Sequence, residues 1–380
     1  MMNSAKNIFQ LKKTPALLLL VVFTGILTCT SQSRTVNSNP HQTYKNTIIK
    51  PNGADFLSYS PNHIKQYVFF GRDGEDIHKP SFFNNRNLEG AQIVYSWRQL
   101  ENHKGAYNFG QIRKDLNFLR AKGKKLFIQI QDVTFDSTRI AVPKYITTDT
   151  IYHGGIVAQY SFTNNNEADF HNAGWSAIRW DKNVAHRFHE LLKALGKEFD
   201  GKIEGINLQE TSAEYGSTGK LYAKGFTPEK YLEAIKGNML ALRQSFTKSK
   251  VIQYANFMPG EDLPDHNKHY LSNVYDYAKE INVGVGGPDI LVYRKGQMNN
   301  SYGLIRESAG KIPIAMAVQE GNYSTLNPQT ARKVTIPEIY TFAKDYLRVD
   351  YIFWCKEEPY YTKKVIPFLK KLNKSKMNTH

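Results

Sequence analysis

The chain has 380 residues, 41% of them hydrophobic and 13% aromatic, which is enough apolar material for one large domain or two ordinary ones and excludes a disordered chain. Its formal net charge of +16 requires an anionic partner to be considered. The basic residues are spread along helix-like stretches without a nucleic-acid-binding motif, so we interpret most of this charge as a solvated basic surface and predict no binding of nucleic acid.

Residues 1–30 have the order of an export signal, because three lysines precede an apolar run from Ala16 to Leu27 that is short for a membrane span. Cys29 closes this run in a stretch that resembles a bacterial lipoprotein box, which would make Cys29 the lipid-anchored first residue of the mature chain. Thr28 stands where a smaller residue is usual. We therefore expect an exported protein that is periplasmic, secreted or held at the cell surface through Cys29.

The rest of the chain divides into a tether, one domain and a tail. Residues 31–60 are rich in Ser, Asn, Thr and Pro, which predicts a flexible tether. Residues 61–372 carry the apolar periodicity of a folded domain, and residues 373–380 form a short basic tail. Cys355 is the only cysteine after the signal, so we expect no intramolecular disulfide.

Within the domain, short apolar runs alternate with amphipathic stretches, which is typical of βα units around a parallel sheet. Eight strands are predicted, at residues 67–71, 91–97, 125–131, 203–209, 250–257, 282–286, 312–319 and 351–355. Helical patterns cover residues 109–122, 184–199, 228–246, 274–279 and 336–347. This number and rhythm predict an α/β fold of the (β/α)8 TIM-barrel type, with a doubly wound open sheet as the alternative.

Residues 135–180, between the third and fourth predicted strands, show no regular pattern. Pro143, His153-Gly154-Gly155 and three consecutive asparagines interrupt any helix or strand there. We predict a long loop, which in a barrel would follow a strand and wall the active site at the carboxyl-terminal face.

Two glutamates are the strongest catalytic candidates, because each directly follows an apolar strand. Glu210 ends the fourth predicted strand and Glu320 ends the seventh. A carboxylate at the mouth of an apolar barrel is partly desolvated, and two such groups can be driven to different pKa values, as a proton donor and a nucleophile require. Glu214 competes with Glu210 for this role, and Glu357 and Glu358 compete with Glu320.

Other side chains at predicted strand ends could line a sugar-binding cleft, since sugars are bound by amides, carboxylates, arginine and aromatic rings. The candidates for substrate binding are Arg72, Trp97, Gln131, Asn207, Gln209, Tyr254, Asn256, Asp289, Trp354 and Glu357. Asp289 follows Gly287-Pro288 and has an alternative role in shaping a turn.

Other classes of chemistry lack their motifs. His186 and His189 share a predicted helix without a cysteine or carboxylate ligand nearby, which favours packing over a zinc site. Neither a G-x-S-x-G nucleophile elbow nor a phosphate-binding glycine loop is present. We predict no metal and no cofactor.

The run from Trp97 to Phe109, W-R-Q-L-E-N-H-K-G-A-Y-N-F, resembles the second-strand segment of retaining barrel glycosidases, notably the family forty-two type beta-galactosidases. Asn102 replaces the proline that is usual in that segment. The resemblance implies that Glu210 is the acid/base, that Glu320 is the nucleophile, and that Trp354 is an aromatic platform beneath the sugar. Those enzymes place Asn before the acid/base, where this chain has Gln209.

Together these features predict a glycoside hydrolase that cleaves a β-linked oligosaccharide or polysaccharide with retention of configuration and without a cofactor. Two alternatives stay open. One is a catalytically inactive barrel that binds glycans or a partner at the cell surface, and the other is an inverting or transglycosylating glycosidase.

Overall fold

The computed structural model describes residues 63–163, 166–261 and 268–377. The predicted export signal, the lipid anchor at Cys29 and the tether lie outside these residues and stay predictions. At the other end, the last helix continues to Met377, past the predicted domain end at residue 372.

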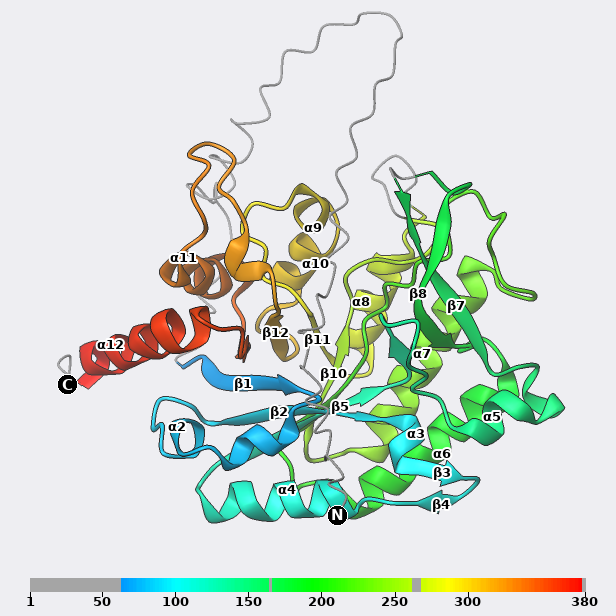
Figure 1. The fold of residues 1–380 in the computed structure, drawn as a ribbon, viewed down its shortest axis with the longest axis horizontal. Coiled ribbons are helices and arrows are strands. Elements are labelled where there is room, and N and C mark those ends of the chain that lie inside the picture. Colours follow the sequence, from blue (N-terminus) through cyan, green and yellow to red (C-terminus); the bar gives the residue numbers. More distant parts are fainter. Residues whose placement is uncertain (1–62, 164–165, 262–267, 378–380) are drawn as a thin grey trace, which may run out of the picture. The chain divides into compact units, whose positions relative to one another are not determined.

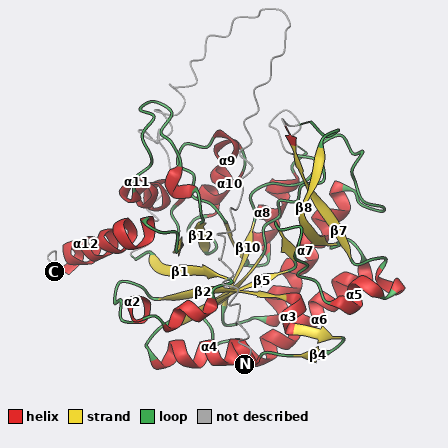
Figure 2. Ribbon diagram, in the orientation of Figure 1, coloured by secondary structure: helices red, strands yellow, loops and turns green. Residues whose placement is uncertain are grey.

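Eight parallel strands close into a barrel, which confirms the predicted fold and excludes the open sheet (Figures 1 and 2). Their order around the barrel is β1-β13-β12-β11-β10-β9-β5-β2, and β1 pairs with both β13 and β2. The strands are β1 (Lys65–Gly71), β2 (Gly90–Ser96), β5 (Lys125–Gln131), β9 (Gly205–Leu208), β10 (Lys250–Tyr254), β11 (Gly284–Gly287), β12 (Ile314–Val318) and β13 (Tyr351–Cys355).

Helices lie outside the barrel and pack an apolar stripe on its wall, as the spacing of their apolar residues predicts (Figure 2). The longer ones are α4 (Gly110–Ala121), α6 (Lys182–Phe199), α7 (Pro228–Ser245), α8 (Tyr270–Glu280), α10 (Ser301–Ser308), α11 (Ile336–Thr341) with η6 (Phe342–Leu347), and η7 (Tyr361–Val365) with α12 (Ile366–Met377). Short helices are η1 (Gly74–His78), α2 (Pro80–Phe83), α3 (Trp97–Leu100), α9 (Lys295–Asn299) and η5 (Asn322–Ser324). Within the described ranges no helix combines the length and the apolar character that crossing a membrane requires.

Side chains fill the inside of the barrel. An aromatic cluster that includes Tyr67, Phe127, Tyr351 and Phe353 occupies its middle, and all four side chains are buried. At the amino-terminal end of the strands, Glu204 accepts hydrogen bonds from Lys65, Lys125 and Tyr351. The barrel is therefore closed at that end, and its carboxyl-terminal mouth is the place for chemistry.

The segment between β5 and α6 differs from the long loop that the sequence predicted. It was expected to be a long loop, but it contains α5 (Lys144–Thr148), η2 (Thr150–Tyr152) and a three-stranded antiparallel sheet. The strands of this sheet are β6 (Val133–Thr134), β7 (Ile156–Phe162) and β8 (Phe170–Ala177), in the order β6-β8-β7. We call residues 133–177 the insertion sheet. It begins directly after β5 and so stands at the mouth end, at the upper right in Figure 1.

Candidate active site

The mouth of the barrel carries a regular arc of polar side chains. Glu210, Asn256, Asp289, Glu320 and Glu357 each lie two residues after the last residue of their strand. The strands β9, β10, β11, β12 and β13 that carry them are consecutive neighbours in the barrel. Because parallel strands end at the same edge, four carboxyl groups and one amide gather on one side of the mouth.

Asn256 holds the carboxyl group of Glu210. Its Nδ2 donates to Glu210 Oε2 at 2.5 Å, while its Oδ1 accepts from the backbone N–H groups of Phe257 at 3.0 Å and Ser212 at 3.3 Å. Those two donors fix which end of the amide faces Glu210. Oε2 is therefore occupied as an acceptor, which favours Oε1 as the oxygen that carries the proton when Glu210 is neutral.

Glu210 is poised to exchange a proton near neutral pH. Burial at the mouth raises its pKa to about 7, the charge of Asp289 adds to this effect, and Asn256 and Arg179 oppose it. A carboxyl group that is neutral at pH values where ordinary glutamates are ionised can act as a general acid.

Asp289 is the second perturbed carboxyl group of the mouth. Burial raises its pKa, although Asn322 Nδ2 donates to its Oδ1 at 2.8 Å. The Oδ1 atom of Asn322, a fully buried residue, accepts from Ile290 N at 3.0 Å and Gln319 N at 3.2 Å. Asn322 thus ties the loop after β11 to the loop after β12, and Asp289 does more than shape a turn.

Glu320 has different neighbours from Glu210. Its side chain is exposed, and burial together with the charge of Glu320 raises the pKa of Glu357. Glu357 Oε2 in turn accepts from the backbone N–H of Gly321 at 3.0 Å, which anchors the turn that carries Glu320. Both predicted catalytic glutamates are thus at the mouth, but Glu210 is linked to Asp289 and Glu320 to Glu357.

A buried ion pair lies behind Glu210 and was missed in the sequence. Arg179 binds Asp132 through Nε and Nη2, both at 2.7 Å, and the two side chains are only 4% exposed. Arg179 Nη1 also donates to Tyr231 Oη at 2.7 Å and to the backbone oxygen of Glu210 at 3.3 Å. The signal was an arginine inside the apolar stretch Ala177-Ile178-Arg179-Trp180, since a buried charge needs a partner.

The prediction that Trp97 and Trp354 bind substrate is wrong, because neither side chain exposes any surface. Trp354 is on the outer face of β13, packed under the helices, and its Nε1 donates to Gln66 Oε1 at 2.7 Å. Residues alternate across a strand, so Phe353 faces the inside of the barrel and Trp354 does not. Neither ring is available to stack on a sugar.

Trp97 belongs to a structural motif that explains the glycosidase-like run at residues 97–109. Its Nε1 and the backbone N–H of Gly105 both donate to the buried carboxylate of Glu101, each at 2.8 Å, and Arg187 completes the cluster. The chain turns there through β3 (Glu101–His103) and β4 (Ala106–Tyr107) into α4. These residues shape the connection after β2, and the family forty-two likeness stays a prediction.

Asn207 and Tyr254 lie beneath the mouth of the barrel, and their contact with substrate stays a prediction. Both are buried, and Gln92 Nε2 donates to Asn207 Oδ1 at 2.9 Å and to Tyr254 Oη at 3.0 Å. Gln209 is buried, its backbone oxygen accepts from Gln253 Nε2 at 2.7 Å, and its contact with substrate stays a prediction.

The substrate contacts of Arg72 and Gln131 stay predictions; Arg72 is largely exposed beyond the end of β1, and Gln131 is half-buried at the end of β5. Partial desolvation of its guanidinium group, together with the charge of the neighbouring Arg139, lowers the pKa of Arg72. Of the rival glutamates, Glu214 is half-buried and its backbone oxygen accepts from Tyr160 N of the insertion sheet at 3.0 Å. Glu358 is exposed and bonds to Thr362.

No group of three or more His, Cys, Asp or Glu side chains is arranged for a metal ion within the part of the chain that the structure describes. His189 of the predicted helix pair is hydrogen-bonded to Asn238 Oδ1 at 2.9 Å, which agrees with a packing role.

No protein-family model and no curated protein matches this chain. Solved structures show a distant barrel likeness over 77% of it. A GH5_18 enzyme from Streptomyces cattleya in complex with Manβ1-4GlcNAc has a TM-score of 0.48 at 10% identity, with 70% of that chain covered. Endo-glycoceramidase II from Rhodococcus sp. has a TM-score of 0.48 at 12% sequence identity, with 73% of that chain covered. A GH10 endoxylanase from a sugarcane soil metagenome has a TM-score of 0.43 at 11% sequence identity, with 86% of that chain covered. The barrel assignment rests on the strand order of this chain itself.

Proposed function

We propose that this chain is a glycoside hydrolase that cleaves a β-linked glycan, with Glu210 as the proton donor. The observation that supports this most is the half-buried carboxyl group of Glu210, whose pKa burial raises to about 7 at the mouth of a closed barrel. The oxygen that leaves when a glycosidic bond breaks is a poor leaving group unless it receives a proton. A neutral carboxyl group fixed at that position supplies one.

The proposed first step uses Glu210 and Glu320 together. Glu320 attacks the anomeric carbon while the bond from that carbon to the glycosidic oxygen breaks, and the proton on Glu210 Oε1 passes to the leaving oxygen. The carboxylate that results at Glu210 keeps the hydrogen bond from Asn256 Nδ2 to its Oε2. This donor stabilises the charge that appears on Glu210 as the reaction proceeds.

In the proposed second step the ionised Glu210 removes a proton from water, and the water oxygen displaces Glu320 from the anomeric carbon. Two displacements at the same carbon give a product of retained configuration. The reaction needs no cofactor, and its substrate would be an oligosaccharide or a polysaccharide.

An inverting reaction is the second candidate, and one specific observation favours it. The carboxyl group whose charge acts on Glu210 is Asp289, from the end of β11, rather than Glu320. In an inverting enzyme, Asp289 would activate a water that displaces the leaving group in a single step. The configuration of the first product distinguishes the two mechanisms.

The experiment is a screen of chromogenic glycosides and cell-wall polysaccharides, followed by NMR detection of the first anomer that forms. Retention supports the pair Glu210 and Glu320, and inversion supports Glu210 and Asp289. In the retaining case, the kcat of Glu320→Gly should be lower by at least about 1,000-fold. Added azide should restore turnover by attacking the anomeric carbon in place of Glu320, and the product should have inverted configuration. Glu210→Ala should keep activity on substrates with good leaving groups and, with azide, give a product of retained configuration.

Glu358→Ala is the matched control, because within the described residues this exposed carboxylate accepts hydrogen bonds from Thr362 of the following helix η7 alone. It should retain the activity of the original protein. If Glu210→Ala is as active as Glu358→Ala on substrates with poor leaving groups, Glu210 is not the acid and Glu214 is the next residue to test. Binding of an oligosaccharide by calorimetry without cleavage of any glycoside would support the inactive barrel instead.

A further inference from the structure

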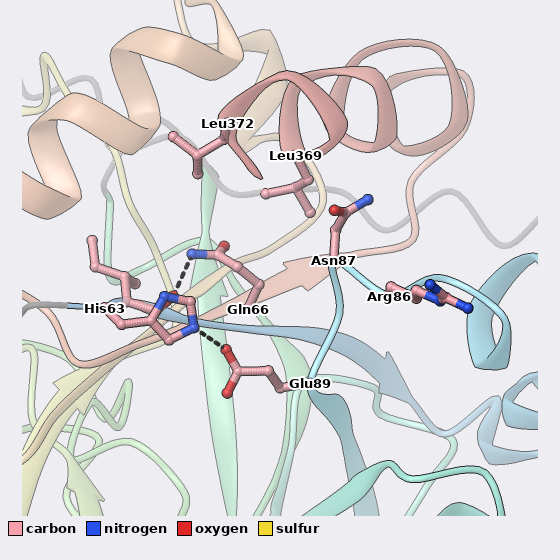
Figure 3. A pocket seen from close by; sticks show the side chains of 8 residues that line it. His63, Gln66, Arg86, Asn87, Glu89, Leu369 and Leu372 are labelled. Carbon is pink, nitrogen blue, oxygen red and sulfur yellow. Dashed lines mark hydrogen bonds and ion pairs between the residues drawn. The ribbon is translucent and has the colours of Figure 1, made fainter. Parts of the chain in front are cut away.

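The amino-terminal end of the barrel, opposite the proposed active site, has two adjoining hollows that share Arg86 and Glu89. The first has a volume of about 160 Å³ and lies under α12, where His63 and Glu89 turn toward each other below Leu369 and Leu372 (Figure 3). The second is an open hollow of about 680 Å³ between the loops that lead into β2 and β5.

The open hollow is cationic. Its charged lining residues are Arg86, Lys122, Lys124, Lys125 and Glu89. Its one acidic residue, Glu89, is already engaged, because its Oε1 lies 2.6 Å from His63 Nε2. Four basic side chains thus face a hollow whose single carboxylate has another partner.

Two of these cations are available to a ligand. The guanidinium group of Arg86 forms no hydrogen bond or ion pair within the part of the chain that the structure describes, and the side chain is exposed. Lys122 is exposed too, and its Nζ lies over the rings of Phe83 and Phe118 at 4.7 and 5.9 Å without a carboxylate partner there. By contrast, Lys124 Nζ donates to backbone oxygens and Lys125 Nζ to Glu204.

The positive charge continues along the same face. Lys202 and Lys248, in the loops that lead into β9 and β10, and Lys250, the first residue of β10, are exposed, and these two strands follow β5 around the barrel. Fewer acidic residues lie there: Asp200, which accepts from the backbone of Lys248 and Ser249, and Glu204, which is paired with Lys65 and Lys125. The cationic charge therefore spans four adjacent strand starts, which suits an extended anionic surface better than a single small anion.

The cationic face is remote from the proposed active site. β1 starts at Lys65 at this end of the barrel, while Glu210 lies beyond the carboxyl-terminal end of β9. A surface bound at the cationic face therefore leaves the mouth accessible to a glycan.

We infer that the cationic face of the barrel, centred on Arg86 and Lys122, docks on an anionic lipid surface by binding lipid phosphate groups. A guanidinium group binds two phosphate oxygens at once, and an ammonium group binds them as a point charge. Each basic residue near such a surface adds to the affinity, and salt screens the attraction over about 8 Å at physiological ionic strength. This docking does not require the proposed glycosidase activity.

The test is co-sedimentation of the full chain with vesicles of phosphatidylcholine alone and of phosphatidylcholine with 30% phosphatidylglycerol. The original protein should bind the anionic vesicles more tightly and lose this preference in 0.5 M NaCl. The double variant Arg86→Gln/Lys122→Gln should bind the anionic vesicles on the order of tenfold more weakly. Any binding by the apolar run at residues 16–27 is common to both proteins and is salt-insensitive.

The matched control is Lys193→Gln/Lys295→Gln, which removes two exposed charges from α6 and α9 and should keep the original affinity. Equal binding of the two double variants, or a preference that survives high salt, would overturn the proposal. Binding of inorganic phosphate or a sulfated oligosaccharide by Arg86 and Lys122, without binding to anionic vesicles, would also overturn it and identify the hollow as a site for a soluble anion.

Discussion

At the scale of single residues, the charge of Asp289 is expected to set the pH range in which Glu210 is protonated. Burial raises the pKa of Glu210 to about 7, and the charge of Asp289 raises it further than burial alone would. Asp289→Asn removes that charge and should lower the pKa of Glu210. Because a general acid is active only while it is protonated, the decline of kcat/KM with rising pH should then begin at lower pH.

The pH profile separates this electrostatic effect from a structural one, because a simple loss of packing would lower kcat/KM at every pH without moving the decline. Glu357→Gln is the control, since Glu357 is electrostatically linked to Glu320 and not to Glu210. It should leave the decline where the original protein has it. An unchanged profile for Asp289→Asn would show that Asp289 does not act on the proton donor.

The same residues show what a strand pattern can and cannot predict. Glu210 and Glu320 lie just beyond apolar runs, and a barrel brings all such positions to one edge, so their location at the mouth was predictable. The run Tyr351-Ile352-Phe353-Trp354-Cys355 is apolar on both faces because the barrel interior and the helices both bury it. Its sequence therefore contains no sign that Trp354 faces the helices, and the platform prediction failed for this reason.

At the scale of secondary-structure elements, the Arg179–Asp132 ion pair joins the two chain segments that directly precede and follow the insertion sheet, and its loss should be costly. Arg179→Met leaves the carboxylate of Asp132 buried without its partner, which should lower the free energy of unfolding by about 3 to 5 kcal/mol. The double variant Arg179→Met/Asp132→Leu removes both charges and should recover most of that loss. Urea denaturation of the two variants measures the difference.

Activity should not recover in the double variant, because Arg179 also donates to the backbone oxygen of Glu210. The control is Arg113→Met, which breaks an ion pair with Glu198 whose side chains are 53% and 30% exposed. It should cost less than about 1 kcal/mol. If Arg179→Met were as mild as Arg113→Met, the buried pair would not hold the insertion sheet in place.

The strands of the insertion sheet lack a local sequence pattern, which is why the sequence predicted a loop at residues 135–180. β7 is half-buried along almost its whole length, so it lacks the alternation of one apolar and one polar face. Its order comes from pairing with β8, and β8 pairs with β6 more than 40 residues earlier in the chain, as in Val133 with Ser176. Pairing between strands so distant in sequence is invisible to a local pattern.

At the scale of the whole molecule, the eight apolar runs in the sequence predicted the number of strands. The closure of the barrel depends in addition on whether adjacent strands can come close enough to pair. Small residues permit that approach between β11 and β12: a Cβ atom added to Gly286 would lie 1.6 Å from the backbone oxygen of Ala315. Such a contact is far inside van der Waals distance, and the atom it meets belongs to the backbone, which cannot rotate away. The two strands would have to separate.

Gly286→Ala should therefore disrupt the pairing of β11 with β12 and lower the free energy of unfolding by more than about 3 kcal/mol, or prevent folding. The matched substitution is Gly303→Ala within α10, where an added Cβ meets no atom within 4 Å and alanine is the better helix former. It should raise the free energy of unfolding by about 0.5 to 1 kcal/mol. Urea denaturation measures both, and if Gly286→Ala were as stable as Gly303→Ala, the register that closes the barrel at β11 and β12 would be incorrect. Because Asp289 and Asn322 stand just beyond these two strands, a folded Gly286→Ala protein should also have a lower kcat on a glycoside that the original protein cleaves.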